Sequence, residues 1–378
     1  MPQRNQPPDG VSQEANALHM ATECIDLHLD GFIWHRFFGY DLHKSHGTGP
    51  LAGHFGGHLD FPRSHAYGLN AGGWSITTNP FRSAQGRWRT FQRNLDRFEQ
   101  HVTRAAVTEP VVIARDIGEY RHARPLAADT EQRGKLPHVV LPAIQGANAL
   151  EGAPNGPASI RDRLITRATL VHLTNSCYGV TSAPINGMRR GDGLTAKGKA
   201  LVEQLDAERI FVDLAHINPA GFWDAVAVHD KSLPLIVTHT GVTGVRPHWR
   251  NIDDEQIKAI ADTGGVVGVI FQLGFLRAKG GASDGEMIVE HLQHIIDVAG
   301  EDFAAIGSDY DGMISPPGGM RREPAYARLV QWMLNRGWSD ERIAKILGAN
   351  FLRSFAALRP AQPSITDAGE PEHAAGAD

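Results

Sequence analysis

The chain has 378 residues, of which 42% are hydrophobic and 21% charged, and its formal net charge is −5. These values are ordinary for a globular enzyme, and the negative balance excludes nucleic-acid binding driven by charge. No stretch approaches the roughly 20 apolar residues of a spanning helix, and no signal-peptide core precedes the first apolar run. We therefore expect a cytoplasmic protein with no membrane partner.

Short apolar runs alternate with amphipathic stretches along most of the chain. The runs that predict strands are 24–29, 73–78, 139–144, 169–174, 210–214, 235–238, 266–271 and 304–307. The stretches with the clearest helical period are 195–205, 253–262 and 285–298, with expected N-caps at Thr195 and Asp253 and a stop at Gly300. Strands that alternate with helices form a parallel sheet covered on both faces. Eight such strands predict a single (β/α)8 TIM barrel.

The domain organisation follows from the same pattern. We expect a flexible N-terminal segment over 1–22, one barrel catalytic domain over 23–358 and a flexible, polar C-terminal tail over 359–378. No GxGxxG follows the first expected strand and no GxxxxGK[ST] occurs, which argues against nucleotide-binding folds. The Gly- and His-rich segment 35–70 would leave the first strand as a loop at the barrel mouth. It is either a mobile lid or an ordinary solvated loop.

Residues with metal-ligating side chains follow four of the expected strands directly. They are His28 and Asp30 in IDLHLD, His216 in FVDLAH, His239 in LIVTHT and Asp309 in AIGSDYDG. Catalytic residues of α/β barrels gather at the carboxyl ends of the strands. Strand alternation would place the two residues of HLD on one face, and imidazole with carboxylate suits Zn²⁺. A lone histidine after an apolar run is more often a core residue, but five such residues together predict a metal site.

Four longer motifs carry a resemblance to a known family. They are GDGLTAKGKALVEQLDAERIFVDLAHIN at 191–218, LPLIVTHTGVTGVRPHWRNIDDE at 233–255, GSDYDG at 307–312 and LTNSCYG at 173–179. From about residue 25 to 355 the chain resembles the membrane (renal) dipeptidases, zinc metallopeptidases of the amidohydrolase superfamily. The resemblance implies a small-molecule or dipeptide substrate and a possible homodimer.

The resemblance also implies roles for single residues. His28 and Asp30 would bind one zinc ion, and His216 and His239 a second. Arg250 would bind the carboxylate of the substrate, for which a planar guanidinium is suited. Asp309 would hold the attacking water and move its proton, with Asp311 as the alternative carboxylate.

Two positions depart from the family pattern. Gln145, in PAIQGANAL, stands where the family has a glutamate that bridges two metal ions. An amide offers one good acceptor oxygen and an NH₂ group that repels cations, so a second ion is in question. Asn175 stands where the family has a fourth-strand histidine that stabilises the oxyanion, and it could still donate a hydrogen bond. His172, three residues earlier, is expected on the opposite strand face.

Three functions remain open from the sequence. The first is hydrolysis of the amide bond of dipeptides or similar carboxylate-bearing amides by a metal-activated water. The second is a mononuclear amidohydrolase that acts on a lactone, an N-acyl amino acid or an amine to be deaminated. The third is a catalytically impaired dipeptidase-like protein that binds its ligand without turnover.

Overall fold

The fold is a nearly closed barrel of eight parallel strands, which confirms the predicted TIM-barrel class. The computed structural model describes residues 10–46, 56–104, 110–126, 130–184, 192–321 and 325–362. The strands follow one another around the barrel in the order β1-β2-β4-β5-β6-β7-β8-β9. Their bounds are Ile25–Leu29, Ala71–Thr77, His138–Gln145, Arg167–Thr169, Phe211–Asp213, Ile236–Thr240, Val266–Val269 and Ala304–Ile306. Between β9 and β1, Leu29 pairs with Tyr310, whose carbonyl accepts from the Asp30 amide at 2.9 Å.

A ninth strand, β3 (Val111–Ile113), was not predicted. It pairs with the amino-terminal half of β4, where His138 to Val140 lie opposite it. The other half of β4 pairs with β5 on that side, through Ala143 and Ile144. β3 therefore occupies the edge of β4 that β5 is too short to cover.

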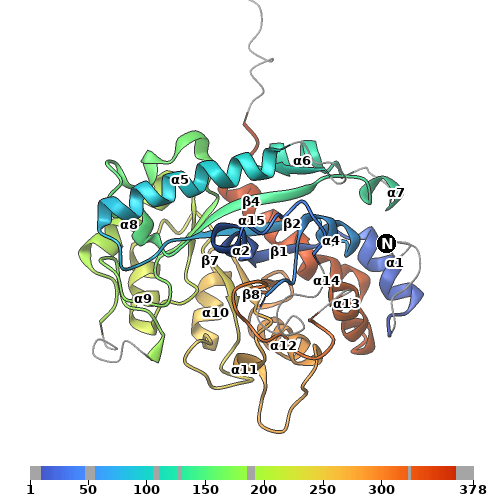
Figure 1. The fold of residues 1–378 in the computed structure, drawn as a ribbon. Coiled ribbons are helices and arrows are strands. Elements are labelled where there is room, and N and C mark those ends of the chain that lie inside the picture. The colour runs from blue at the N-terminus through green and yellow to red at the C-terminus, as the bar shows by residue number, and fades with distance from the viewer. Residues whose placement is uncertain are drawn as a thin grey trace, which may run out of the picture.

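Helices surround the strands (Figure 1). The helices on the described part of the chain include α2 (Gly31–Phe38), α4 (Phe61–Ala66), α5 (Ala84–Thr103), α6 (Ile117–Ala123), α7 (Thr130–Arg133), α8 (Ala196–Ala207), α9 (Pro219–Val228), α10 (Asp254–Ala261), α11 (Leu273–Leu276), α12 (Glu286–Ala299), α13 (Ala325–Asn335), α14 (Asp340–Ala344) and α15 (Asn350–Leu358). In Figure 1, α5 and α6 lie on one side of the strands, and α10 and α12 on the other. Thr195 and Asp253 cap α8 and α10 as predicted, and Gly300 ends α12.

Two apolar clusters hold these layers together. One lies between the helices and the strands and includes Val140, Val212 and Ile306. The other takes alternate positions of the same strands, such as Leu141 and Phe211, and packs them against Phe351 and Phe355 of α15. The alternation of side chains along each strand produces both clusters. A Cβ on Gly73 would lie 2.3 Å from the Leu27 carbonyl oxygen, so glycine at this position of β2 allows β1 to approach.

Both ends of the barrel domain extend beyond the predicted bounds. Residues 13–21 fall in the segment expected to be flexible, but they form α1 (Gln13–Ala21), which packs against α13. Arg359, expected in the tail, is fully buried. Its guanidinium donates to four backbone carbonyls, those of Arg115, Arg163, Ile165 and Arg209. Residues 1–9 and 363–378 of the two expected segments lie outside the described residues.

The His-rich segment after β1 is partly helical and partly buried where the structure describes it. It contains the end of α2 and all of α4, and every residue from Gly56 to His65 is buried. The His43 ring hydrogen-bonds the carbonyl of His101 at 2.6 Å, and the His65 ring that of Pro110 at 2.9 Å. His54 lies outside the described residues. The rings are therefore used for packing this segment onto α5 and the strand ends.

Across the described ranges, no helix combines the length and the apolar character that a membrane crossing requires. Cytoplasmic location, homodimer formation and the absence of nucleic-acid and membrane partners stay predictions.

Candidate metal and substrate site

Three of the expected ligand residues meet where β1 and β9 end. His28 Nε2 lies 3.6 Å from Asp30 Oδ1 and 3.5 Å from Asp309 Oδ1. The Asp309 amide donates to the carbonyl of His28 at 3.1 Å, so the two strand ends are joined directly beside these side chains. All three residues are buried. Residues separated by about 280 positions in the sequence thus form one polar group at the barrel mouth.

The ends of β6 and β7 bring two further histidines to the same place. His216 Nε2 and His239 Nε2 lie 2.8 Å apart, and the His239 ring stacks on His28 with centroids separated by 3.8 Å. Within the described chain, the atoms of His28, His239 and Asp309 form a group of possible metal ligands that lie within 4.8 Å of one another. This geometry is suited to a cation bound by imidazole and carboxylate.

A polar layer beneath the cluster orients His239. The Thr238 hydroxyl donates to Asp213 Oδ2 at 2.6 Å, so its oxygen is left to accept from His239 Nδ1 at 2.8 Å. This hydrogen bond places the ring proton on Nδ1 and leaves the Nε2 lone pair directed into the cluster. Arg167 completes the layer, since its Nη1 donates to Asp213 Oδ2 at 2.7 Å.

Burial favours the protonation states that a metal site requires of its histidines. Burial lowers the pKa values of His28, His216 and His239 well below the usual range, so the imidazoles are neutral at pH 7. The same burial, with the nearby Asp30 carboxylate as a smaller cause, raises the pKa of Asp309 well above its usual range. Two crowded, buried carboxyl groups are stabilised in their charged form by a cation, which fits a divalent ion at this cluster.

Two buried polar atoms near the cluster have no hydrogen-bond partner among the described residues, and both belong to expected site residues. They are Arg250 Nε and His216 Nδ1. Arg250 is only 4% exposed, and its Nη2 donates to the carbonyl of His239 at 2.7 Å. Because a buried donor without a partner is costly, this guanidinium is suited to receive an anionic ligand.

The central side chain of the site is Gln145, at the end of β4. In the amide orientation that pairs donors with acceptors, the NH₂ group of Gln145 donates to Asp30 Oδ2 at 2.9 Å and to Oδ1 at 3.0 Å. Its oxygen accepts from the Nε2 atoms of His28 and His172, each at 3.2 Å. The amide therefore lies between the β1 ligands and the residues that follow β5.

The expectation that His172 points away from the site is wrong. β5 ends at Thr169, so strict alternation no longer applies three residues later. His172 contacts Gln145, and its ring lies edge-on to His216 with centroids 4.7 Å apart. The side-chain oxygen of Asn175 instead accepts from the Thr181 amide at 3.0 Å, within its own loop.

Asp311 binds backbone amides and is not one of the clustered ligand residues. Its carboxylate accepts from the amides of His58 at 2.9 Å and of Leu59 at 3.3 Å. These bonds hold the His-rich segment against the loop after β9.

Two of the expected site residues have an unusual backbone conformation. His216 and Asp309 have positive φ values of 68° and 63°, which are costly for residues other than glycine and cluster at functional sites.

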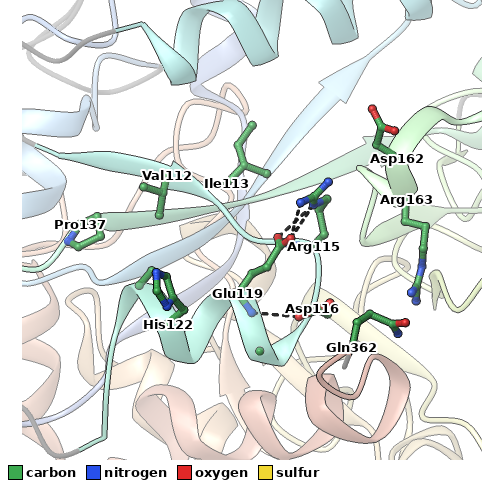
Figure 2. A pocket seen from close by; sticks show the side chains of 12 residues that line it. Val112, Ile113, Arg115, Asp116, Glu119, His122, Pro137, Asp162, Arg163 and Gln362 are labelled. Carbon is green, nitrogen blue, oxygen red and sulfur yellow. Dashed lines mark hydrogen bonds and ion pairs between the residues drawn. The ribbon is translucent and has the colours of Figure 1, made fainter. Parts of the chain in front are cut away.

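A large cleft lies away from these residues. It has a volume of about 1020 Å³ and is lined by parts of β3 and α6 with Pro137, Asp162 and Arg163, which precede β4 and β5 (Figure 2). It is therefore at the amino ends of the strands. Two of its charged groups pair with each other, Arg115 with Glu119. None of the expected ligands lines it, and in this fold that end serves stability rather than catalysis.

Comparison with known sequences identifies the family of the chain. The family model for membrane dipeptidases, peptidase family M19, matches residues 12–365. The chain belongs to the membrane dipeptidase family.

Two known proteins match part of the chain. An uncharacterized protein encoded in the pqqA 5′ region of Klebsiella pneumoniae is 39% identical over 166 residues, or 43% of this chain and 60% of that protein. An uncharacterized dipeptidase of Schizosaccharomyces pombe is 29% identical over 211 residues, or 56% of this chain and 51% of that protein. The chain thus spans between half and two thirds of the length of these relatives.

Solved structures of family members share the fold. A structure described as dipeptidase AC, a metallopeptidase of family M19, has a TM-score of 0.73 at 24% identity and covers 90% of this chain and 100% of its own. A Rhodobacter sphaeroides metallopeptidase, bound to a phosphinate mimic of L-Ala-D-Ala, has a TM-score of 0.72 at 23% identity, with 89% and 99% covered. At these identities the likeness supports the barrel, and the chemistry must be argued from this chain's own residues.

Proposed function

We propose that this membrane dipeptidase family member is a zinc-dependent hydrolase of dipeptides. The observation that carries the proposal is the group formed by His28, His239 and Asp309, with the buried Arg250 tied to the carbonyl of His239. A ligand set of imidazole and carboxylate suits zinc. A guanidinium with an unpartnered Nε suits a carboxylate, which every dipeptide carries at its C-terminus.

In this proposal each residue has a separate task. Arg250 binds the substrate carboxylate and so fixes the scissile amide over the cluster. Asp309 accepts a proton from the attacking water and delivers it to the leaving amine. The Nε2–H of His172, which the Gln145 oxygen accepts in this structure, turns to the carbonyl oxygen of the substrate as negative charge develops there. When bound, the zinc ion supplies a Lewis acid that lowers the pKa of water into the neutral range.

Asn175 has a supporting task in this account. Its side-chain oxygen is engaged with Thr181, so it holds the loop after β5 in the shape that presents His172. A direct hydrogen bond from Asn175 to the oxyanion stays a prediction from the sequence. No feature of the described residues favours the lactonase, deaminase or non-catalytic alternatives over dipeptide hydrolysis.

The test is a substrate panel with metal-depleted and zinc-loaded protein. L-Ala-L-Ala and L-Ala-D-Ala are incubated with each form, and released alanine is quantified by chromatography; a simple lactone and N-acetylalanine serve as comparison substrates. The stereochemical pair is included because a structural neighbour binds a mimic of L-Ala-D-Ala. We expect zinc-dependent release from at least one dipeptide. Turnover of the lactone alone, or no turnover of any substrate with zinc bound, would contradict the proposal.

The matched variant is Asp309→Asn, which keeps the size of the side chain and removes the proton carrier. General acid–base catalysis contributes roughly 10²- to 10⁴-fold, so kcat is expected to fall by that factor. Asp311→Asn serves as the control, because Asp311 bonds to backbone amides outside the cluster. An equal loss in both variants would remove the special role given to Asp309.

A further inference from the structure

Gln145 gives this site an arrangement of charge that differs from a two-metal centre. Its side chain is buried, and both halves of the amide are engaged: the NH₂ group with the two Asp30 oxygens and the oxygen with His28 and His172. A carboxylate in this position could bind one cation with each oxygen. An amide presents a single neutral acceptor, and its NH₂ hydrogens repel a cation on that side.

The two possible metal positions therefore differ in the ligands that they offer. The position beside His28, His239 and Asp309 has two carboxylates within reach, because Asp30 Oδ1 lies 3.6 Å from His28 Nε2. Two carboxylates balance the charge of one divalent ion. A second position beside His216 would have only imidazole and the Gln145 oxygen, which are all neutral.

Fixed positive charge near the site adds to this difference. Arg167 Nη2 lies 3.1 Å from His28 Nδ1, and Arg250 donates to the carbonyl of His239. Both guanidinium groups are buried, so little solvent screens them. A second divalent ion would add two positive charges to a site whose carboxylates the first ion has already neutralised.

We propose that the site binds one divalent ion, at His28, His239 and Asp309, and that the Gln145 amide takes the place of a second ion. On binding, the ion replaces the proton that His28 Nε2 donates to the Gln145 oxygen. The inference rests on the proposed function in that a metal ion binds here at all. His216 is then released from ligation and stays beside His172, whose ring lies edge-on to it. The amide that limits the metal content also holds Asp30 and His172 in place.

The test is the number of ions per chain. Metal-free protein is equilibrated with zinc, freed of unbound metal by gel filtration and analysed for zinc and protein concentration. We expect one zinc per chain in the wild type and two in Gln145→Glu, which restores a bridging carboxylate. Gln204→Glu adds the same charge at an exposed position of α8 and is expected to stay at one.

A second set of variants tests where the ion binds. His216→Ala is expected to keep the single ion and to return Gln145→Glu from two ions to one, whereas Asp309→Ala loses the ion. With Mn²⁺ in place of zinc, Gln145→Glu should show the electron paramagnetic resonance signal of a coupled pair and the wild type that of an isolated ion. Two ions in the wild type, or loss of the ion in His216→Ala, would overturn the inference and leave dipeptide hydrolysis standing. No ion in the wild type would overturn both.

Discussion

Arg250 is the residue on which substrate choice depends in this account. Arg250→Lys keeps the positive charge but loses the planar fork that a carboxylate can bind with two hydrogen bonds. A charge-assisted hydrogen bond contributes roughly 1.5–3 kcal/mol, so kcat/KM for a dipeptide should fall about 10- to 100-fold. The measurement compares L-Ala-L-Ala with its C-terminal amide. The wild type should strongly prefer the free carboxylate, and an undiminished preference in Arg250→Lys would exclude the assigned role.

His172 and Asn175 can be separated by substitution. Removing one donor to an oxyanion costs roughly 10²- to 10³-fold in kcat, so His172→Ala should lose that much. Asn175→Ala should act mainly through the loop that Thr181 helps to hold, with a smaller loss in kcat. Steady-state kinetics of both variants decide between them. A larger loss of kcat in Asn175→Ala would return the oxyanion role to Asn175.

At the residue scale, the sequence placed the expected ligands at strand ends, where the structure brings them together. It could do so because each lies at or just beyond the end of an expected strand, as His28 does in 24–29 and His239 does after 235–238. It failed for His172 because β5 stops at Thr169 and the chain then turns. The histidine in TLVHLT was the available signal, but strand alternation was extended past the point where the strand ends.

At the scale of the strands, two shifts in strand register orient His28 and His239. The register shifts between Asp26 and Leu29 on β1 and between Val237 and Thr240 on β7. Such irregularities break the strict alternation of side chains, and they are frequent beside active sites. His28 and His239 lie at these two positions, and their rings stack. Sequence periodicity alone cannot locate such shifts, since they depend on how neighbouring strands pair.

The contact between His138 of β4 and Trp74 of β2 predicts that stability depends on pH. Trp74 Nε1 donates to His138 Nε2 at 3.0 Å, and the other ring nitrogen of His138 bonds to the carbonyl of Leu69, also at 3.0 Å. The neutral ring satisfies both contacts, whereas a proton on Nε2 would face the Trp74 N–H. Burial lowers the pKa of His138 to about 3.

The sign of the effect follows from this lowered pKa. Below the unfolded-state pKa of roughly 6.5 only the unfolded chain takes up the proton, so stability is complete above that pH and is lost as the pH falls. His138 alone should cost about 2 kcal/mol between pH 6.5 and 5. Urea titrations of the metal-free wild type and His138→Gln at several pH values measure the slope. His138→Gln should have a shallower slope than the wild type and than His122→Gln, which changes an exposed histidine; equal slopes would contradict the assignment.

At the scale of the whole molecule, Arg359 ties the C-terminal end of the domain to the loops that lead into the barrel. Its guanidinium bonds to carbonyls from three separate segments, at Arg115, at Arg163 with Ile165, and at Arg209. Truncation after Leu358 should lower the free energy of unfolding by at least about 3 kcal/mol, because several charge-assisted hydrogen bonds are lost. Truncation after Gln362 should leave it unchanged. Urea titration of the two shortened chains provides the comparison, and equal stability would show that Arg359 is dispensable.

The barrel itself could be predicted because alternating strands and helices leave few other architectures for eight buried parallel strands. The predicted strand 169–174 begins where the observed strand, Arg167–Thr169, ends, since its apolar character continues into a loop. β3 was missed because three residues are too short to show a period. The packing of the His-rich segment could not be predicted, because it depends on distant partners such as Asp311 and His101, which no local pattern reveals.

The most direct measurement is a zinc titration of metal-free protein in which bound zinc and dipeptide hydrolysis are followed together. We expect activity to be absent without metal, to rise in proportion to bound zinc and to reach its plateau at one equivalent per chain. Zinc that binds at the site without any hydrolysis of a dipeptide, or hydrolysis that persists after the metal is removed, would contradict the proposal that this is a metal-dependent dipeptidase.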